Sequence, residues 1–152
     1  MENSKTIETH WLPDEKLIVT QIAGDVTKED ILNWKKGLEH SLDQIADNSS
    51  FKIFVNLYGF KAIDLEAHKS FRGIVPLTLA DYGWKVGYVN LFDESSSMAL
   101  KNERGIKCVA AAHTHQDASK IEQYEIRFGR DEEHFFTDPQ KAEEWIKAIP
   151  VN

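Results

Sequence analysis

Residues 51–57 read FKIFVNL, a short and nearly continuous apolar run. A β-strand that other elements cover on both faces has this composition, because neither face then needs polar side chains toward water. The preceding residues 47–50 read DNSS, a cluster that is typical of a loop. The run therefore predicts a strand that is buried on both faces.

An amphipathic helix is predicted just before this strand, over residues 27–45. Its apolar side chains recur at intervals of three and four residues, which places them on one helical face. Thr27 is the expected N-cap, and Asp30, three residues later, completes a near capping box. The apolar face comprises Ile31, Trp34, Leu38, Leu42 and Ile45.

The beginning of the chain predicts a β-hairpin. Residues 6–11 and 16–22 are both rich in β-forming side chains, and the segment Pro13-Asp14-Glu15 between them has the composition of a turn. Gly24 is expected to close the second strand. The hairpin would supply the antiparallel part of the sheet.

Beyond the central strand, residues 65–79 have a weaker helical pattern. Pro76 should end or kink this helix, because proline lacks the backbone N–H of a helix interior. Residues 81–83 indicate a turn, and residues 84–92 (WKVGYVNLF) predict another strand. A short helix over 98–104, capped by residues 95–97 and stopped by Gly105, and a strand over 106–113 are expected next.

The C-terminal part continues the alternation. Asp117 is the expected N-cap of a helix that ends at Gly129, and residues 133–136 predict a short strand. Asp138 and Pro139 mark the start of a last helix, because Asp is favoured at the N-cap and Pro at the first helical position. The inward side chains of these two helices are Ile121, Tyr124, Phe128, Ala142, Trp145, Ile146 and Ile149.

This order of elements predicts the α/β class. After the opening hairpin, strands alternate with helices, which implies right-handed crossovers and a mixed, mostly parallel sheet with helices packed on it. We expect four to six strands. A length of 152 residues fits one domain, and no repeat or long linker divides the chain, so residues 1–152 are expected to form a single domain.

Composition restricts the partners and the location of the protein. The formal net charge is -7, which argues against nucleic acid or an anionic membrane surface as the main partner. No run approaches about 18 consecutive apolar residues, so no transmembrane segment is predicted. The polar N-terminus has no signal-peptide pattern, and a cytoplasmic location is expected. The lone Cys108 lies in an apolar run and predicts a buried, inert thiol.

The best candidate for chemistry is the segment HTHQD at residues 113–117, between a predicted strand and a predicted helix. Open α/β sheets bind ligands at this edge, and alternate residues of a strand point to one face. His113 and His115 are therefore candidate ligand-binding or interface residues. With Asp117 as a third ligand they would form a zinc site of hydrolase type. We favour hydrogen-bonding or interface histidines, because Asp117 is already explained as an N-cap.

Other catalytic motifs are absent from the sequence. There is no GxGxxG, no Walker A sequence and no Gly-x-Ser-x-Gly. No acid pair is singled out by its spacing. We therefore predict no catalytic residue, no metal and no cofactor, and expect a protein that is not an enzyme.

The apolar segment 71–84 is a candidate binding surface, because Gly73, Pro76 and Gly83 interrupt it. Its side chains cannot all face one sheet surface, so some should cover a pocket or pair with a second copy of the chain. Phe71, Tyr82 and Trp84 are its candidate ligand-binding or interface residues. A homodimer is the expected state.

Four stretches together resemble the SpoIIAA-like family, which is similar in fold to STAS domains. They are GDVTKED at the helix start, KIFVNLYGF, WKVGYVNLF and the ending HFFTDPQKAEEWI. The resemblance covers most of the chain, and the ending is its most specific part. It implies a STAS-like fold.

In function, the resemblance implies a non-enzymatic binding or regulatory module. The partner would be a protein or a small apolar ligand, since the family is often compared with Sec14-type lipid carriers. A carrier of a lipophilic small molecule is the alternative. Anti-sigma-factor antagonists carry a phosphorylatable serine after the buried strand, but residues 60–66 read FKAIDLE and the first serine beyond them is Ser70. A phosphorylation switch at this position is not expected.

Overall fold

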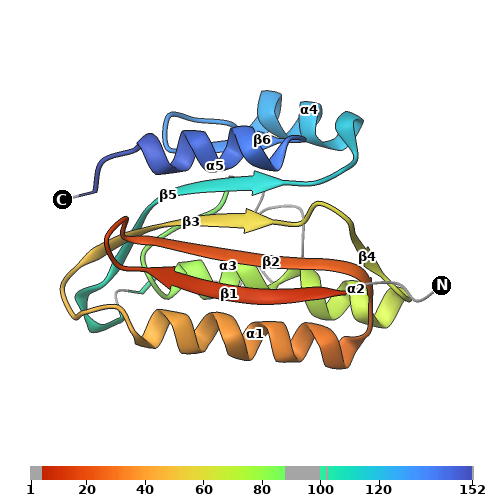
Figure 1. Cartoon of the computed structure of the whole chain (residues 1–152), viewed down its shortest axis with the longest axis horizontal. Helices are drawn as coiled ribbons and strands as arrows, with labels where there is room; N and C mark the ends of the chain where they lie inside the picture. The colour runs from red at the N-terminus through yellow and green to blue at the C-terminus, as the bar shows by residue number, and fades with distance from the viewer. Residues whose placement is uncertain (1–4, 88–99, 102, 152) are drawn as a thin grey trace.

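A mixed β-sheet forms the centre of the protein in the computed structural model, which describes residues 5–87, 100–101 and 103–151. Its strands lie in the order β1 (Thr6–Leu12), β2 (Leu17–Val26), β3 (Ser50–Asn56), β5 (Lys107–Thr114) and β6 (Glu133–Phe136). The hairpin β1–β2 is antiparallel, and every later pair is parallel (Figure 1). The predicted α/β class and the mostly parallel sheet with its N-terminal hairpin are confirmed.

Helices cover both faces of this sheet. The helices α1 (Lys28–Asp43), α2 (Leu65–Arg72) and α3 (Ile74–Ala80) pack on one face, and α5 (Pro139–Ala148) packs on the other (Figure 1). The helix α4 (Ala118–Phe128) packs against β6. This layering leaves the carboxyl ends of the parallel strands between α2 and α4.

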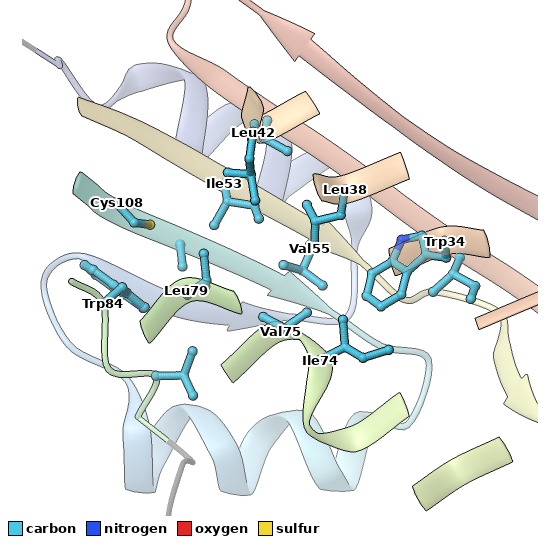
Figure 2. Close-up of a cluster of buried hydrophobic side chains, with 14 of the residues drawn as sticks. Trp34, Leu38, Leu42, Ile53, Val55, Ile74, Val75, Leu79, Trp84 and Cys108 are labelled. Atoms are coloured by element: carbon cyan, nitrogen blue, oxygen red, sulfur yellow. The ribbon is translucent and has the colours of Figure 1, made fainter. Parts of the chain in front are cut away.

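The larger core lies between α1, α3 and the sheet. Side chains of α1 and α3 point toward Ile53 and Val55 of β3, as Figure 2 shows. Trp34 of α1 is buried, and its indole N–H donates to the Thr20 hydroxyl over 2.7 Å. The apolar periodicity of residues 31–45 therefore identified the packed face of α1 correctly.

Local capping fixes where the helices begin. Thr27 accepts from the backbone N–H of Asp30, and the Asp30 carboxylate accepts from the N–H of Thr27, which makes the predicted capping box. Asp117 and Asp138 accept from backbone N–H groups in the first turns of α4 and α5. Asp64 does the same for α2, a cap that the sequence analysis did not identify.

The predicted helix over residues 65–79 is two helices. The break is at Gly73, between α2 and α3, rather than at Pro76. Pro76 lies in the first turn of α3, where a backbone N–H has no helical partner in any case, so the ring does not disrupt the helix. The change of direction lets α3 bury Ile74, Val75 and Leu79 against the sheet.

Three other predictions differ from the structure. Gly24 does not close β2, which continues to Val26. Residues 84–87 are not a strand, although Trp84 and Val86 are buried; residues 88–92 lie outside the described part. A short helix was also expected over 98–104. Residues 100–101 are not helical, and residues 103–105 form a 3-10 turn. Residues 95–99 and 102 lie outside the described part. The strand β4 (Phe60–Ala62), which pairs with the end of β2, was not predicted because it has only three residues.

Within the described ranges, no helix has both the length and the apolar character needed to cross a membrane.

Candidate functional site

A cavity of about 230 Å³ lies between α2–α3 and α4, beside the carboxyl ends of β3 and β5. This is the edge at which open α/β sheets bind ligands. Most of its wall is apolar, as in other small-molecule sites. The apolar lining is Val55, Leu57, Phe71, Val75, Pro76, Ile121 and Phe135.

The polar part of the wall is basic and aromatic. His113 and His115 come from the end of β5, so the strand places the two predicted histidines at the same cavity. Thr114 lies at the end of β5 as well, and the helices contribute the remaining polar side chains, which are His68, Arg72, Lys120 and Tyr124. Among the described residues that line this cavity, none is a carboxylate.

A second hollow of about 260 Å³ adjoins the first and extends toward β4. Lys61 and Asp64 are among its lining residues. The two hollows have five residues in common, which we call the shared rim: Leu57, His68, Phe71, His115 and Lys120. His68 and Lys120 are exposed and His115 is half-buried, so the shared rim is open to solvent.

His113 is held by a buried carboxylate. Its Nε2 lies 2.7 Å from Oε2 of Glu133, and its ring stacks on Phe135 at a centroid separation of 4.7 Å. The register of β5 and β6 makes both contacts possible, because His113 is paired with Phe135 and Glu133 lies two residues earlier on the same face. The imidazole is therefore a fixed part of the cavity wall.

His115 has a different environment just beyond the end of β5. Its Nδ1 accepts the backbone N–H of Asp117 over 3.0 Å. An accepting Nδ1 places the proton of the neutral ring on Nε2. Burial lowers the pKa of His115, and the nearby Lys120 lowers it further, while Asp117 opposes both effects. Near neutral pH the ring is therefore an uncharged N–H donor.

Hydrogen bonds hold the loop after β3 against the end of β5. The Gln116 amide accepts from the Gly59 N–H over 2.8 Å and donates to the Phe60 carbonyl over 2.9 Å. The Thr114 hydroxyl donates to the Asn56 side chain over 2.7 Å. These bonds join the ends of β3 and β5, and so they fix the backbone on which the shared rim lies.

Phe71 connects the cavity to the core. Its ring stacks on Phe60 at 4.2 Å and on Trp34 at 5.6 Å, between centroids. Phe71 thus lines the cavity, and its role as a ligand-binding or interface residue stays a prediction.

Tyr82 and Trp84 do not line the cavity. Tyr82 lies edge-on to Phe51, at a centroid separation of 5.7 Å, near the amino end of β3. Trp84 is buried, with the Arg130 guanidinium 4.4 Å from its ring centroid. The two residues belong to the packing at the opposite end of β3, because the chain turns away from the cavity after α3.

The apolar surface expected from segment 71–84 is also smaller than predicted. Ile74, Val75, Leu79 and Trp84 are buried, Phe71 and Tyr82 are half-buried, and Leu77 is exposed. The break at Gly73 allows α3 to face the sheet, so this segment gives less reason to expect a partner surface. The homodimer stays a prediction, which light scattering can test.

The residues proposed as a possible zinc set have other partners. The Nε2 of His113 is bonded to Glu133, Nδ1 of His115 accepts a backbone N–H, and Asp117 caps α4. In the part of the chain that the structure describes, no three His, Cys, Asp or Glu side chains are placed to hold a metal ion. The hydrolase alternative therefore gains no support from this geometry.

Comparison with known proteins gives a likeness in fold. No family model matches the sequence, and no curated protein matches it. Among solved structures, the chain is similar to an uncharacterised protein of the DUF3478 family with a SpoIIAA-like fold, from Shewanella loihica PV-4. The TM-score is 0.52 and the identity 15%, over 96% of each chain.

The chain has a SpoIIAA-like fold. This confirms the fold expected from the resemblance, over nearly the whole chain. An identity of 15% carries no functional residue from one protein to the other, so the site must be argued from this chain alone.

Sequence analysis did not identify several residues of the cavity in this SpoIIAA-like fold. Tyr124 was predicted only as an inward side chain of a helix, and His68 and Arg72 received no functional interpretation. Lys120 and Glu133 received no functional interpretation. The sequence pattern that could have identified four of these residues is an i, i+4 spacing. It places His68 and Arg72 on one helical face, and Lys120 and Tyr124 on another.

Proposed function

We propose that the protein is a non-enzymatic binding module of STAS-like type and that the cavity between α2–α3 and α4 is its ligand site. One observation carries this proposal. The cavity lies at the carboxyl ends of β3 and β5 and has a largely apolar wall with a few polar side chains on one side. Sites for small molecules have this composition.

Binding is favoured over catalysis by the state of the candidate reactive groups. His113 is bonded to buried Glu133, and His115 and Asp117 take part in the turn before α4. Cys108 is buried, and desolvation raises the pKa of its thiol far above the ordinary value. A thiol in this environment is a poor nucleophile.

A small lipophilic molecule is the ligand class that the cavity favours over a protein partner, because a concave apolar site encloses a small ligand better than a protein surface. Regulation by phosphorylation at the start of α2 has no support. Asp64 occupies the N-cap and Leu65 and Glu66 follow, so no hydroxyl is available there.

The proposal can be tested with N-phenyl-1-naphthylamine, a neutral apolar dye whose fluorescence rises in apolar surroundings. We expect saturable binding to the full chain. Leu57→Trp should weaken the binding at least about tenfold, because the larger ring fills space at the shared rim. Leu32→Trp is the matched control, since Leu32 is exposed on α1, and it should bind as the parent does.

Absence of saturable binding by the parent protein would contradict the proposal. Equal binding by the parent and by a folded Leu57→Trp variant would place the dye elsewhere. Native mass spectrometry of the purified protein would show in addition whether an organic molecule remains bound.

A further inference from the structure

We propose that the ligand is a small amphipathic anion, an apolar body in the cavity with one carboxylate or phosphate group at the shared rim. The inference rests on the proposed function and adds the chemistry of the head group. It follows from the distribution of charge around the cavity.

The basic character of the lining contrasts with the rest of the chain. The formal net charge is -7, with 25 acidic and 18 basic residues. The cavity and the shared rim nevertheless bring together Lys120, Arg72 and three histidines. A site that concentrates positive charge in a negatively charged protein attracts anionic ligands, and the surrounding low-dielectric wall strengthens that attraction.

Lys120 is the central cation of the rim. Its ammonium lies 5.6 Å from the ring centroid of Tyr124, one turn further along α4, which directs the side chain along the cavity wall. Within the described part of the chain, no carboxylate pairs with Lys120 at ion-pair distance. An anionic ligand would therefore not have to displace an internal partner.

The two imidazoles complete the rim. His115 carries its proton on Nε2 and can donate to an anion, and His68 lies on the opposite side, on α2. A hydrogen bond to an anionic group is stronger than a hydrogen bond between two neutral groups, and several donors can bind the same anion. This arrangement suits a single compact head group.

One carboxylate does belong to the second hollow. It is Asp64, and its Oδ1 accepts the N–H of Ala67 over 2.8 Å at the start of α2. A carboxylate at a helix N-terminus is offset by the positive end of the helix dipole. The rim therefore keeps a net attraction for anions, and the buried Glu133 lies behind His113 rather than in the opening.

The apolar wall determines the rest of the ligand. Phe71, Val75 and Ile121 offer no hydrogen bonds, so a free inorganic anion would leave most of the cavity unoccupied. A ligand with both parts would bury apolar surface and pair its charge. An uncharged ligand of the same size would bury the same apolar surface but would have no charge to pair.

The test compares decanol, decanoate and decyl phosphate as competitors of the neutral dye, at concentrations where each is monomeric. At least one anion should displace the dye at about tenfold lower concentration than decanol. The tighter of the two anions identifies the head group. Lys120→Gln should reduce this preference several-fold, because it weakens the binding of the anion more than that of decanol, whereas Lys36→Gln, exposed on α1, should leave both unchanged.

The outcomes separate the two proposals. If the dye and decanol bind while neither anion binds more tightly than decanol, the anion inference is overturned and the binding module stands. If the dye does not bind at all, the proposed function fails as well. A preference for anions that survives in both Lys120→Gln and His115→Gln would also overturn the inference.

Discussion

Nε2 of His113 and Oε2 of Glu133 lie 2.7 Å apart in the interior, and neither side chain is appreciably exposed. Glu133 also accepts the Gly87 N–H over 3.0 Å and lies 3.1 Å from an Arg130 nitrogen. One buried carboxylate thus joins β5, the start of β6 and the segment after α3. It orients the imidazole that forms part of the cavity wall.

Glu133→Ala is expected to destabilise the protein by about 3 kcal/mol, because a buried imidazole, a backbone N–H and a guanidinium lose their common acceptor. Chemical denaturation measures this change. Glu132→Ala, at the exposed neighbouring position, is the control and should change stability by less than about 0.5 kcal/mol. Equal effects of the two substitutions would show that the buried cluster does not stabilise the fold.

Lys52 provides a second prediction, on the opposite face of the sheet. It is buried, and its ammonium donates to the carbonyls of Ile146, Lys147 and Ile149 at the end of α5. Lys52→Met keeps the side-chain length but removes these donors, so we expect a loss of about 1–3 kcal/mol in the free energy of unfolding. Lys141→Met, exposed on α5, should have little effect. Full stability of Lys52→Met would mean that the carbonyls find other donors.

The role of Lys52 also shows how far the sequence predicts this fold. The run FKIFVNL correctly indicates a strand covered on both faces, although it contains a lysine. The long stem of lysine lets a buried strand position supply a helix C-terminus with donors. Nothing in the local sequence indicates this, because the acceptors are about 95 residues away in the chain.

Prediction of the candidate site was limited in the same way. His113 and His115 could be predicted because ligands bind at the ends of parallel strands. The opposing wall depends on where α2 and α3 separate, and one glycine decides that. Tyr82 and Trp84 were selected for being apolar near helix breakers, a pattern that core packing produces equally well.

Two glycines give opposite expectations for the same substitution. Gly105 has φ +70°, and an added Cβ would lie 3.3 Å from Cα of Asn48, whose N–H is bonded to the Arg104 carbonyl over 2.9 Å. Gly105→Ala should therefore cost about 1–3 kcal/mol.

Gly37 lies within α1, where an added Cβ meets only the Thr9 hydroxyl at 3.8 Å. Gly37→Ala should stabilise the protein by about 0.5–1 kcal/mol, because alanine is the better helix former. Thermal and urea unfolding of both variants give the comparison. If Gly105→Ala stabilised the protein instead, this would contradict the expectation that the turn at Gly105 becomes strained when a side chain is added.

The pH dependence of anion binding follows from His115. Its pKa is below the ordinary histidine value of 6.5, first because of burial and then because of Lys120, so the ring of the free protein is neutral at pH 7–8. As the pH falls below 6.5 the ring takes up a proton, and a carboxylate at the rim favours that uptake. Decanoate, whose carboxyl group titrates at about pH 4–5 like other carboxyl groups, stays largely ionised down to about pH 5.5.

Decanoate affinity is therefore expected to rise several-fold between pH 8 and pH 5.5, while decanol affinity stays constant. Asp117, the N-cap of α4, lies beside His115. The other charged or titratable groups that line the two hollows with His115 are Lys61, Asp64, His68, Arg72, His113, Lys120 and Tyr124. Because His68 is also an imidazole, His115→Gln and His68→Gln are measured separately and together. Dye-displacement titrations at each pH give the affinities. The double variant should remove most of the rise, and a decanoate affinity that stays flat or falls toward pH 5.5 in the parent protein would contradict a head group at the imidazoles.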